Sequence, residues 1–573
     1  MLVATAGTLV LRRSPGAQSD PGSNRPPSGT AGAPRRGGQI VVSVRTEPQT
    51  FNRYTRRDWP TDLISLLVNA KLTRVNRVTQ QVEPWLAERW DVSPDGTVYT
   101  VTLRPGVTFS DGHPFTADDV VFSFRAVYDG KSGSVLGDAL MVRGRPLTVT
   151  AKDPSTVEIR FPEAFAPGMR LLDNLPILPK HKLEAALDAG AFGSAWNLGT
   201  PPADVVGLGP YIIKEYSPGQ RTVLERNPRY FRKDEAGVQL PYLDRVIVEV
   251  VPDQNAELLR LASGDLDITT AEVRPEDYAP LKRLADAGRI TLLDLGVAYD
   301  ADSFWFNLKP GAFAGDARAA WIQRDELRQA ISLAVDRQLF ADTVYLGAGV
   351  PVFGPVTPAN KQWFSPAVPQ TPHDPVRARE LLASIGLMDR NNDGRLEDQA
   401  GTPARFTLMV QKGRTTHERA ASVIRDELAK IGLTVDVVGL DGAALVERFI
   451  GTRQYDAVYF SVLTTDTDPA STPDFWMSRG SARVWNHSQP KPATEWEARM
   501  DDLMERQAHT MDQVERKRLF DEAQLLFAEH LPIVYFVAPK VFAAASSRVT
   551  NVKPGISRPQ ILWSPDTIAV SAP

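Results

Sequence analysis

The sequence predicts an α/β protein of at least two domains, and three observations lead to this prediction. Its 573 residues exceed the roughly 250–300 residues at which a single hydrophobic core stops growing. Its composition, 42% hydrophobic and 23% charged, is typical of a folded globular chain. Strand and helix patterns alternate in two stretches that hairpin-rich sequence separates, which favours two α/β lobes with a cleft between them.

The first half of the chain begins with strand and helix patterns and continues into hairpins. An apolar strand is expected at 40–44 and a helix near 63–72. A Ser-Pro-Asp-Gly turn precedes the alternating sequence VYTVTL at 98–103, which is typical of a hairpin. Thr116 stands three residues before Asp119, the spacing of a capping box, so a helix is expected to begin there.

Crossover units are expected on both sides of the middle of the chain. Residues 243–251 read as a strand, after which Asp253 caps a helix that ends at Gly264 and leads to a strand at 266–269. In the second half, a strand, a helix and a strand give a parallel crossover. The elements expected in that half are a helix from 325, a strand at 406–410, a helix at 416–431, strands at 433–438 and 455–462, helices at 494–508 and 512–529 and a strand at 533–537.

Charge and residue content exclude several classes of function. The 65 basic and 69 acidic residues give a net charge of −4, so no broad positive surface for nucleic acid or an anionic membrane is expected. The absence of cysteine excludes disulfides, thiolate nucleophiles, iron–sulfur clusters and cysteine zinc sites. The histidines have no short metal-binding spacing, and the sequence has no nucleophile elbow, phosphate-binding loop or dinucleotide-binding motif. Pairs of carboxylates leave a glycosidase open as an alternative.

The N-terminal region has features of an export leader followed by a tether. Residues 1–11 are apolar and precede Arg12 and Arg13, whereas a signal peptide carries its positive charge first. A leader that has lost its basic start explains this order, and a plain hydrophobic N-terminus is the alternative. Residues 12–38 are rich in Ser, Gly, Pro and Arg, as a disordered tether is. We expect folded structure to begin near Gln39.

Several segments resemble a known family, in the same order along the chain. The segment LRPGVTFSDGHPFTADDVVFSF at 103–124 is similar to the signature of the family 5 extracellular solute-binding proteins, whose members bind peptides, nickel chelates and some sugars for ABC importers. Further similar segments are EPWLAERW at 83–90, GLGPYIIKEYSPGQRTVLERNPRYF at 207–231, LRQAISLAVDR at 327–337 and YDAVYFSVLTTDTDP at 455–469. Together they extend over nearly the whole folded chain.

The resemblance implies a two-lobed, periplasmic-binding-protein-like fold of the class II type, with an extra domain inserted in the first lobe. Residues 1–37 would be the leader remnant and tether. The remaining assignment is 38–60, 208–298 and 538–573 to lobe I, 61–207 to the inserted domain and 299–537 to lobe II. Ligand binding would favour a closed state of the hinge between the lobes.

The same resemblance implies a receptor of an ABC importer, not an enzyme. Such a receptor captures a peptide-like solute in the cleft and delivers it to the permease and ATPase complex at the inner membrane. We therefore expect a monomer with no cofactor requirement and no nucleic-acid partner, located in the periplasm or tethered there through its leader. A nickel or other metal chelate, or an oligosaccharide, is the alternative ligand. A hydrolase on a two-lobed scaffold is the alternative of another class.

Two acidic residues are the first candidates for ligand contact. In peptide-binding relatives, an Asp in the loop after the strand equivalent to 455–462 pairs with the ligand ammonium group, and here that loop offers Asp466 and Asp468. Val462 and Leu463 stand where an aromatic residue usually precedes this Asp, which departs from the family pattern. The alternative is that both carboxylates cap turns or the next helix.

Aromatic and amide side chains complete the set of candidates. Trp305 and Asn307 match the family's second hinge crossing, where a side chain can face the cleft and pack on the ligand. Tyr54 lies in the loop after the first strand, and Trp476 follows the Asp-rich loop. Core packing is the alternative role for these side chains.

One segment resembles the opening of a calcium loop. Asp389, Asn391 and Asp393 stand at alternate positions with Gly394 next, as in an EF-hand. The twelfth position is Ala400 instead of the bidentate glutamate. A structural calcium ion is one interpretation, and a turn in which Asp and Asn side chains bond to the backbone is the alternative.

Overall fold

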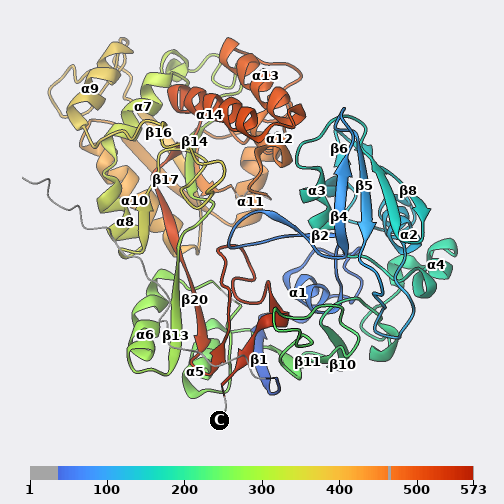
Figure 1. Ribbon diagram of the computed structural model, residues 1–573. Coiled ribbons are helices and arrows are strands. Elements are labelled where there is room, and N and C mark those ends of the chain that lie inside the picture. The colour runs from blue at the N-terminus through green and yellow to red at the C-terminus, as the bar shows by residue number, and fades with distance from the viewer. Residues whose placement is uncertain (1–35, 271, 463–465, 572–573) are drawn as a thin grey trace, which may run out of the picture.

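The computed structural model describes residues 36–270, 272–462 and 466–571, which form two lobes and a third domain beside them (Figure 1). The leader and tether predicted at 1–37 lie almost entirely outside the described residues. Within those residues, no helix is both long and apolar enough to cross a bilayer.

Lobe I is built on a mixed sheet that contains strands from both ends of the chain. Strand β1 pairs in parallel with β12, and β11 and β10 continue the sheet antiparallel. Bridges from Ile268 to Val42 and to Ala545 connect β1 to β20, which pairs with β13. The elements are β1 (Gln39–Val44), β10 (Tyr211–Ser217), β11 (Arg221–Arg226), β12 (Arg245–Val250), α5 (Gln254–Ser263), α6 (Pro275–Asp286), β13 (Ile290–Val297), β20 (Val537–Ser546), β21 (Val549–Thr550) and β22 (Ala569–Val570).

The inserted domain is an antiparallel sheet in the order β4-β5-β9-β8, with helices on its side. Thr116 and Asp119 form the expected cap, because the Thr116 backbone N–H donates to Asp119 Oδ2 at 2.9 Å and helix α2 follows. The elements are α1 (Trp59–Val68), β2 (Thr73–Val75), β3 (Val82–Pro84), β4 (Ala87–Val92), β5 (Val98–Leu103), α2 (Ala117–Tyr128), β6 (Met141–Val142), β7 (Arg145–Pro146), β8 (Thr148–Asp153), β9 (Thr156–Arg160), α3 (Gly168–Leu171) and α4 (Lys180–Asp188).

Lobe II contains a second mixed sheet, in the order β17-β16-β18-β14-β19. Strand β16 pairs in parallel with β17 and β18, which confirms the predicted parallel crossover, and β14 is antiparallel to β18. The elements are β14 (Asp302–Phe306), α7 (Asp325–Ala334), α8 (Arg337–Val344), β15 (Gly349–Pro351), α9 (Pro375–Ser384), β16 (Arg405–Gln411), α10 (Thr415–Ala429), β17 (Thr434–Leu440), α11 (Gly442–Val446), β18 (Ala457–Ser461), α12 (Pro473–Trp476), α13 (Glu495–His509), α14 (Gln513–His530) and β19 (Val534–Tyr535).

The lobes are joined where β13 leads to β14 and where β19 leads to β20. The first connection is the short segment 298–301, and the second passes through Phe536 into the long strand β20. Strand β20 pairs with β15 of lobe II at its start and with β13 of lobe I further along, so one strand belongs to both lobes (Figure 1). The two connections also contact each other, since the Ala298 N–H donates to the Pro539 carbonyl at 2.9 Å. This pair of segments is the hinge region.

The hydrophobic cores divide the molecule into two bodies. One continuous cluster extends from Ile40 of lobe I to Val101 of the inserted domain and takes in Ala470 at the boundary with lobe II, whereas the main clusters of lobe II lie around Phe304 and Trp305. A shared close-packed core resists relative movement, and separate cores permit it. Lobe I and the inserted domain therefore form one unit, and lobe II forms the other.

The Gly-Leu-Gly-Pro motif at 207–210 has a steric explanation. A Cβ atom on Gly207 would overlap the Val68 carbonyl oxygen, and one on Gly209 would overlap the same peptide group. The Gly209 N–H donates to that carbonyl at 2.7 Å. Only glycine allows β10 to approach the end of α1 this closely, so the motif attaches the inserted domain to the lobe I sheet.

Candidate functional site

The inserted domain meets lobe II at a polar contact on the side of the hinge. We call this contact the lobe junction; it consists of Gln80, Arg170, Tyr299, Asn360, Asp466 and Thr467. Arg170 Nε donates to Asp466 Oδ1 at 2.5 Å, and a terminal nitrogen of Arg170 donates to Thr467 Oγ1 at 2.6 Å. Helix α3 therefore presents a guanidinium group directly to the loop that follows β18 in lobe II.

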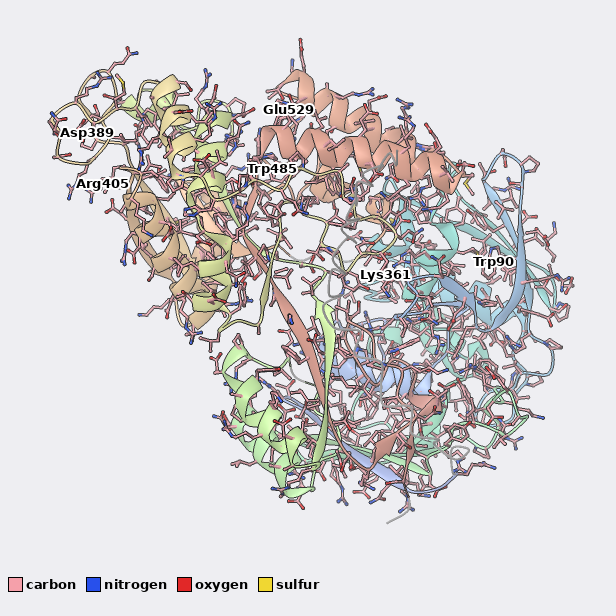
Figure 2. The ribbon with its side chains drawn as sticks, turned by 60° about the vertical axis from the view of Figure 1, so that its left-hand side comes forward. Trp90, Lys361, Asp389, Arg405, Trp485 and Glu529 are labelled. Atoms are coloured by element: carbon pink, nitrogen blue, oxygen red, sulfur yellow. The ribbon has the colours of Figure 1, made fainter. Side chains whose placement is uncertain are left out.

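The turn between β2 and β3 forms the second half of the lobe junction. The buried Gln80 amide donates to the Tyr299 hydroxyl at 2.8 Å and to the Ala359 carbonyl at 2.7 Å. It also accepts from the Lys361 N–H at 3.1 Å, and Lys361 lies between lobe II and the inserted domain (Figure 2). The Gln80 side chain thus contacts the hinge and lobe II together, which fixes how the inserted domain lies against lobe II in this structure.

Burial and charge act against each other at the Arg170–Asp466 pair. Burial raises the pKa of Asp466; the Arg170 guanidinium offsets part of this rise, and Asp468 adds to it. Burial alone lowers the pKa of Arg170, but the attraction of Asp466 and Asp468 raises it overall. The Asp466 carboxylate is thus poorly hydrated. A neighbouring cation, either Arg170 or a ligand group, is needed to favour its ionised form.

Asp468, the second acidic candidate, lies in a different environment from Asp466. Both of its carboxylate oxygens accept from Arg516, at 2.7 and 3.1 Å, and both side chains are buried. Oδ1 also accepts from the Ala470 N–H at 3.0 Å and so caps the short helical turn after it. Both oxygens of the Asp468 carboxylate are therefore engaged by contacts within lobe II. A role of Asp468 in ligand contact stays a prediction.

Trp305 lies in β14, the strand into which the hinge segment 298–301 leads, and Asn307 directly follows that strand; ligand contact by either residue stays a prediction. Trp305 is in β14, a strand flanked by β18 and β19 in the lobe II sheet, and it is 0% exposed. Its ring packs edge-on against Phe449. The Asn307 side chain donates to the Arg453 carbonyl at 3.0 Å. All five residues of β14 are buried. The strand therefore lacks the alternation of buried and exposed residues that would distinguish a core-facing side from a cleft-facing side.

Tyr54 and Trp476 also pack inside the protein. Tyr54 is 0% exposed, and its hydroxyl donates to the Pro176 carbonyl at 2.7 Å. Trp476 is buried in lobe II, where its ring lies edge-on to Phe520 and Phe527. Ligand contact by these two residues stays a prediction, and in this structure both contribute packing.

The segment around Asp389, which resembles the opening of a calcium loop, folds as a turn at the outer end of lobe II (Figure 2). The Asp389 carboxylate accepts from the backbone N–H groups of Asp393 and Gly394, at 3.2 and 3.0 Å, and the Asn391 carbonyl oxygen accepts from the Asp393 N–H. These are the bonds of an Asx-type turn. Within the described ranges, no three His, Asp or Glu side chains are grouped to hold a metal ion. Calcium binding by Asp389, Asn391 and Asp393 stays a prediction.

The buried Asp302 and His417 and the half-buried Ser461 form a cluster where β18 reaches the loop before Asp466. The Ser461 hydroxyl donates to Asp302, and His417 Nε2 is 3.5 Å from the other Asp302 oxygen. Burial alone would raise the pKa of Asp302, but the hydrogen bond and charge of His417, with Arg414 and Ser461, lower it to about 2. A catalytic triad needs Ser, His and Asp in a chain through both ring nitrogens. His417 Nδ1 has no hydrogen-bond partner among the described residues, so this arrangement is different.

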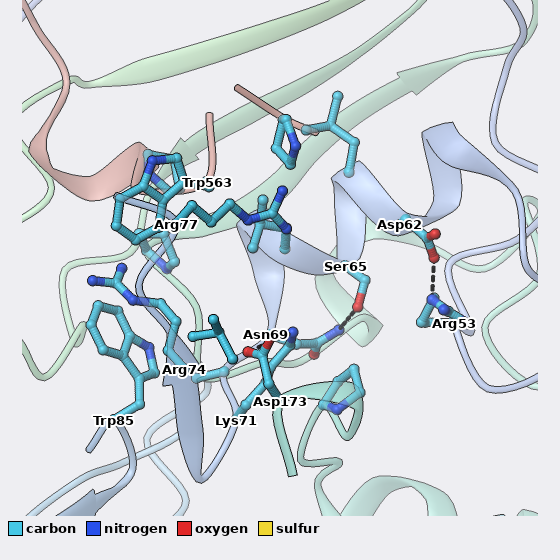
Figure 3. A pocket seen from close by; sticks show the side chains of 18 of the residues that line it. Arg53, Asp62, Ser65, Asn69, Lys71, Arg74, Arg77, Trp85, Asp173 and Trp563 are labelled. Carbon is cyan, nitrogen blue, oxygen red and sulfur yellow. Dashed lines mark hydrogen bonds and ion pairs between the residues drawn. The ribbon is translucent and has the colours of Figure 1, made fainter. Parts of the chain in front are cut away.

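A cavity of about 220 Å³ lies between the inserted domain and lobe I (Figure 3). Helix α1, strand β2 and the C-terminal segment 558–566 form most of its walls, and no described residue of lobe II lines it. None of its residues was predicted as a site from the sequence. Because they come from segments far apart in the chain, neither spacing nor periodicity could have grouped them.

Comparison with known proteins supports the overall resemblance. The family model described as "Bacterial extracellular solute-binding proteins, family 5 Middle" matches residues 81–483. A probable ABC transporter-binding protein of Deinococcus radiodurans is 28% identical, over 91% of this chain and 91% of that protein. The oligopeptide-binding protein AppA of Bacillus subtilis is 28% identical, over 93% of this chain and 92% of that protein. The solved structure of B. subtilis AppA with a nonapeptide covers 94% of this chain and 100% of that chain, with a TM-score of 0.67 at 27% identity.

Proposed function

Because the chain belongs to the bacterial extracellular solute-binding proteins of family 5, we propose that it captures a peptide-like solute between lobe I and lobe II and delivers it to an ABC importer. The receptor acts outside the cytoplasm, and its partners are the importer's permease and ATPase. It works as a monomer, because each chain carries both lobes and the hinge between them.

The hinge is the observation that carries this proposal. Lobe I and the inserted domain share one core, and lobe II connects to them through segment 298–301 and strand β20. A ligand that contacts both bodies shifts the population toward the closed state by its differential affinity for that state. A permease can then distinguish loaded from empty receptor by shape alone.

Peptide is the solute class that the relatives and the charge distribution favour. The B. subtilis relative is named as an oligopeptide-binding protein and was solved with a nonapeptide. In this chain the Asp466 carboxylate lies between the two bodies and already carries a cationic partner, Arg170. A ligand ammonium group at this position would exchange with the Arg170 guanidinium, so binding would replace one charge-assisted contact with another.

Release of the solute unchanged is the second part of the proposal. A hydrolytic role needs a nucleophile whose base is oriented by a third group. In the cluster of Ser461, His417 and Asp302, the serine hydroxyl instead donates to the aspartate, and its distance to His417 Nε2 is a longer 3.4 Å. The polar bonds of the cluster tie β14, α10 and β18 together, which suits a structural role in lobe II.

Calorimetric titration of the purified full chain tests the ligand class. The titrants are short synthetic peptides of mixed length, the nickel–histidine chelate and an α-galactoside, each also followed by the shift in melting temperature. We expect saturable binding and a raised melting temperature with peptides alone, because a ligand that binds only the folded state stabilises it. Stabilisation by the chelate or the galactoside without the peptides would contradict the peptide assignment, and cleavage of a titrant would contradict the receptor role.

A further inference from the structure

The charged residues that line the cavity between α1, β2 and 558–566 are paired, with one exception in the described part of the chain. The pairs are Arg53 with Asp62, Lys71 with Asp173, Arg74 with Glu83, Arg558 with Glu272 and Asp566 with Arg232. Arg77 has no such carboxylate partner. The structure therefore places one cation in the cavity wall whose charge no neighbouring side chain neutralises by direct contact.

The environment of Arg77 favours an anionic ligand. One terminal nitrogen donates to the Ser557 carbonyl at 3.0 Å, and the guanidinium group, which has five donors, makes no other hydrogen bond with the described residues. Burial lowers the pKa of Arg77 to about 10, and Asp173 opposes this from a greater distance. Arg77 is half-buried, and a cation that has lost part of its water gains more from an anion than a fully solvated one does. Figure 3 shows the Arg77 side chain extending from beside Trp563 toward helix α1.

A second polar group in the same cavity lacks a partner. Asn69 ends helix α1 and is 8% exposed. Its amide nitrogen donates to the Ser65 hydroxyl at 3.1 Å, but its carbonyl oxygen Oδ1 is buried and accepts no hydrogen bond from the described residues. Buried acceptors are nearly always satisfied in folded proteins, because an unsatisfied one keeps its full desolvation cost. An O–H or N–H group in the cavity would satisfy it.

Three tryptophans are among the other lining residues of the cavity, together with aliphatic and proline side chains. Trp59, Trp85 and Trp563 line it, and the Arg74 guanidinium lies 3.6 Å from the Trp85 ring centre and 4.7 Å from that of Trp563. The Arg74 guanidinium, itself paired with Glu83, thus covers one face of each of these two rings, and the Arg232 guanidinium lies 4.0 Å from the Trp85 ring centre. Rigid aromatic walls favour a planar ring over a flexible chain.

We propose that this cavity is a second ligand site, which binds a small ring-bearing carboxylic acid that also carries a hydroxyl or N–H group. The carboxylate pairs with Arg77, the donor bonds to Asn69 Oδ1, and the ring packs against the apolar side chains of the wall, Trp59 among them. A planar monoanion suits the free edge of the guanidinium group. A doubly charged phosphate fits less well, because Asp62, Asp173 and Asp566 line the same cavity.

This site is separate from the lobe junction and goes beyond the proposed capture of a peptide-like solute. All of its described lining residues belong to the body formed by lobe I and the inserted domain. A ligand there does not need lobe II to close. The site is nevertheless close to the hinge, because Arg77 and Gln80 lie on the same turn and Gln80 contacts Tyr299.

Titration of the full chain with three matched probes tests the site. The probes are 4-hydroxybenzoate, which has ring, carboxylate and donor, 4-hydroxybenzamide, which lacks the charge, and benzoate, which lacks the donor. We expect 4-hydroxybenzoate to bind, the amide to bind at least about tenfold more weakly, and benzoate to bind several-fold more weakly, because charge-assisted bonds are about twice as strong as neutral ones. No binding of 4-hydroxybenzoate, or equal affinity for it and the amide, would overturn the proposal.

Variants locate the binding within the cavity. Arg77→Gln should weaken 4-hydroxybenzoate at least about tenfold while leaving the amide unchanged, and Asn69→Ala should abolish the advantage over benzoate. Arg405→Gln is the matched control, because Arg405 is an exposed arginine of lobe II paired with Asp436. Unchanged affinity in Arg77→Gln would place the ligand elsewhere and contradict the proposal. Peptide titration of the same samples distinguishes failure of this proposal from failure of the proposed function, because the two sites are separate. Loss of 4-hydroxybenzoate binding should leave peptide binding intact, and loss of peptide binding should leave 4-hydroxybenzoate binding intact.

Discussion

Arg170 of the inserted domain donates through Nε to Asp466 of lobe II at 2.5 Å, across the boundary between the two bodies of the molecule. The residues are 296 positions apart in the sequence. Both side chains are largely withdrawn from solvent, with side-chain exposures of 10% and 18%. The contact therefore stabilises the arrangement of the two bodies seen in this structure, and a hinge movement that separates helix α3 from the loop after β18 breaks it.

Removal of this contact should open the molecule. In Arg170→Gln, the closed state loses a charge-assisted pair and leaves the Asp466 carboxylate without its cation, at a cost of about 1–3 kcal/mol relative to the open state. Each 1.4 kcal/mol is a tenfold change in the closed-to-open ratio, so small-angle X-ray scattering should report a larger radius of gyration. The control is Arg405→Gln, at an exposed pair away from the junction. Identical scattering from Arg170→Gln and the parent would show that the contact does not hold the lobes together.

The Asp468–Arg516 pair should contribute to the stability of lobe II. Asp468→Ala leaves a buried guanidinium without its anion, which typically costs about 3–5 kcal/mol in the free energy of unfolding. Asp436→Ala, at an exposed pair, should cost less than about 1 kcal/mol. Urea unfolding of both variants measures the difference. If the two variants lost equal stability, Asp468 would have no special structural role and its availability to a ligand would have to be reconsidered.

Asp302 should make part of the stability depend on acid pH. Its pKa in the folded protein is about 2, below the unfolded value near 3.9, so its contribution is present above about pH 4 and is lost as the pH falls toward 2. The shift corresponds to about 2–3 kcal/mol. Asp302→Asn should be less stable at pH 6, and its deficit relative to the parent should narrow by about 1 kcal/mol at pH 3. A deficit that stays constant between these pH values would contradict the assigned shift.

Tyr54 provides a test of a residue that packs in the core and was also a ligand candidate. Tyr54→Phe removes the hydroxyl that donates to the Pro176 carbonyl at 2.7 Å and leaves that buried carbonyl without its donor. We expect the free energy of unfolding to fall by about 1–2 kcal/mol, with unchanged affinity for the solute. Thermal melting and titration of the variant measure these two quantities. A loss of affinity at unchanged stability would assign the hydroxyl to the ligand site.

Local elements were predictable because their signals are local. The Thr116–Asp119 cap marks the start of α2, and the helix that Asp253 caps ends at Gly264, which adopts the left-handed conformation at φ 91°. The parallel crossover of β16, α10 and β17 followed from strand and helix periodicity. In each case, neighbouring residues decide the structure.

The site residues were harder to predict because distant segments decide them. Nothing near Asp466 in the sequence shows that Arg170 lies against it, and the partners of Arg77 and Asn69 become visible only when α1, β2 and the C-terminal segment meet. The role of Trp305 could not be read from the sequence, because all five residues of β14 are buried. A strand of this kind has no periodic signal to distinguish a sheet centre from a hinge.

Native mass spectrometry of the intact chain after incubation with a defined peptide mixture tests the central claim most directly. The account predicts a complex of one chain with one peptide, from which denaturation releases the peptide at its original mass. Recovery of shortened peptides would contradict it. The absence of any complex at peptide concentrations that saturate the B. subtilis relative would contradict it equally.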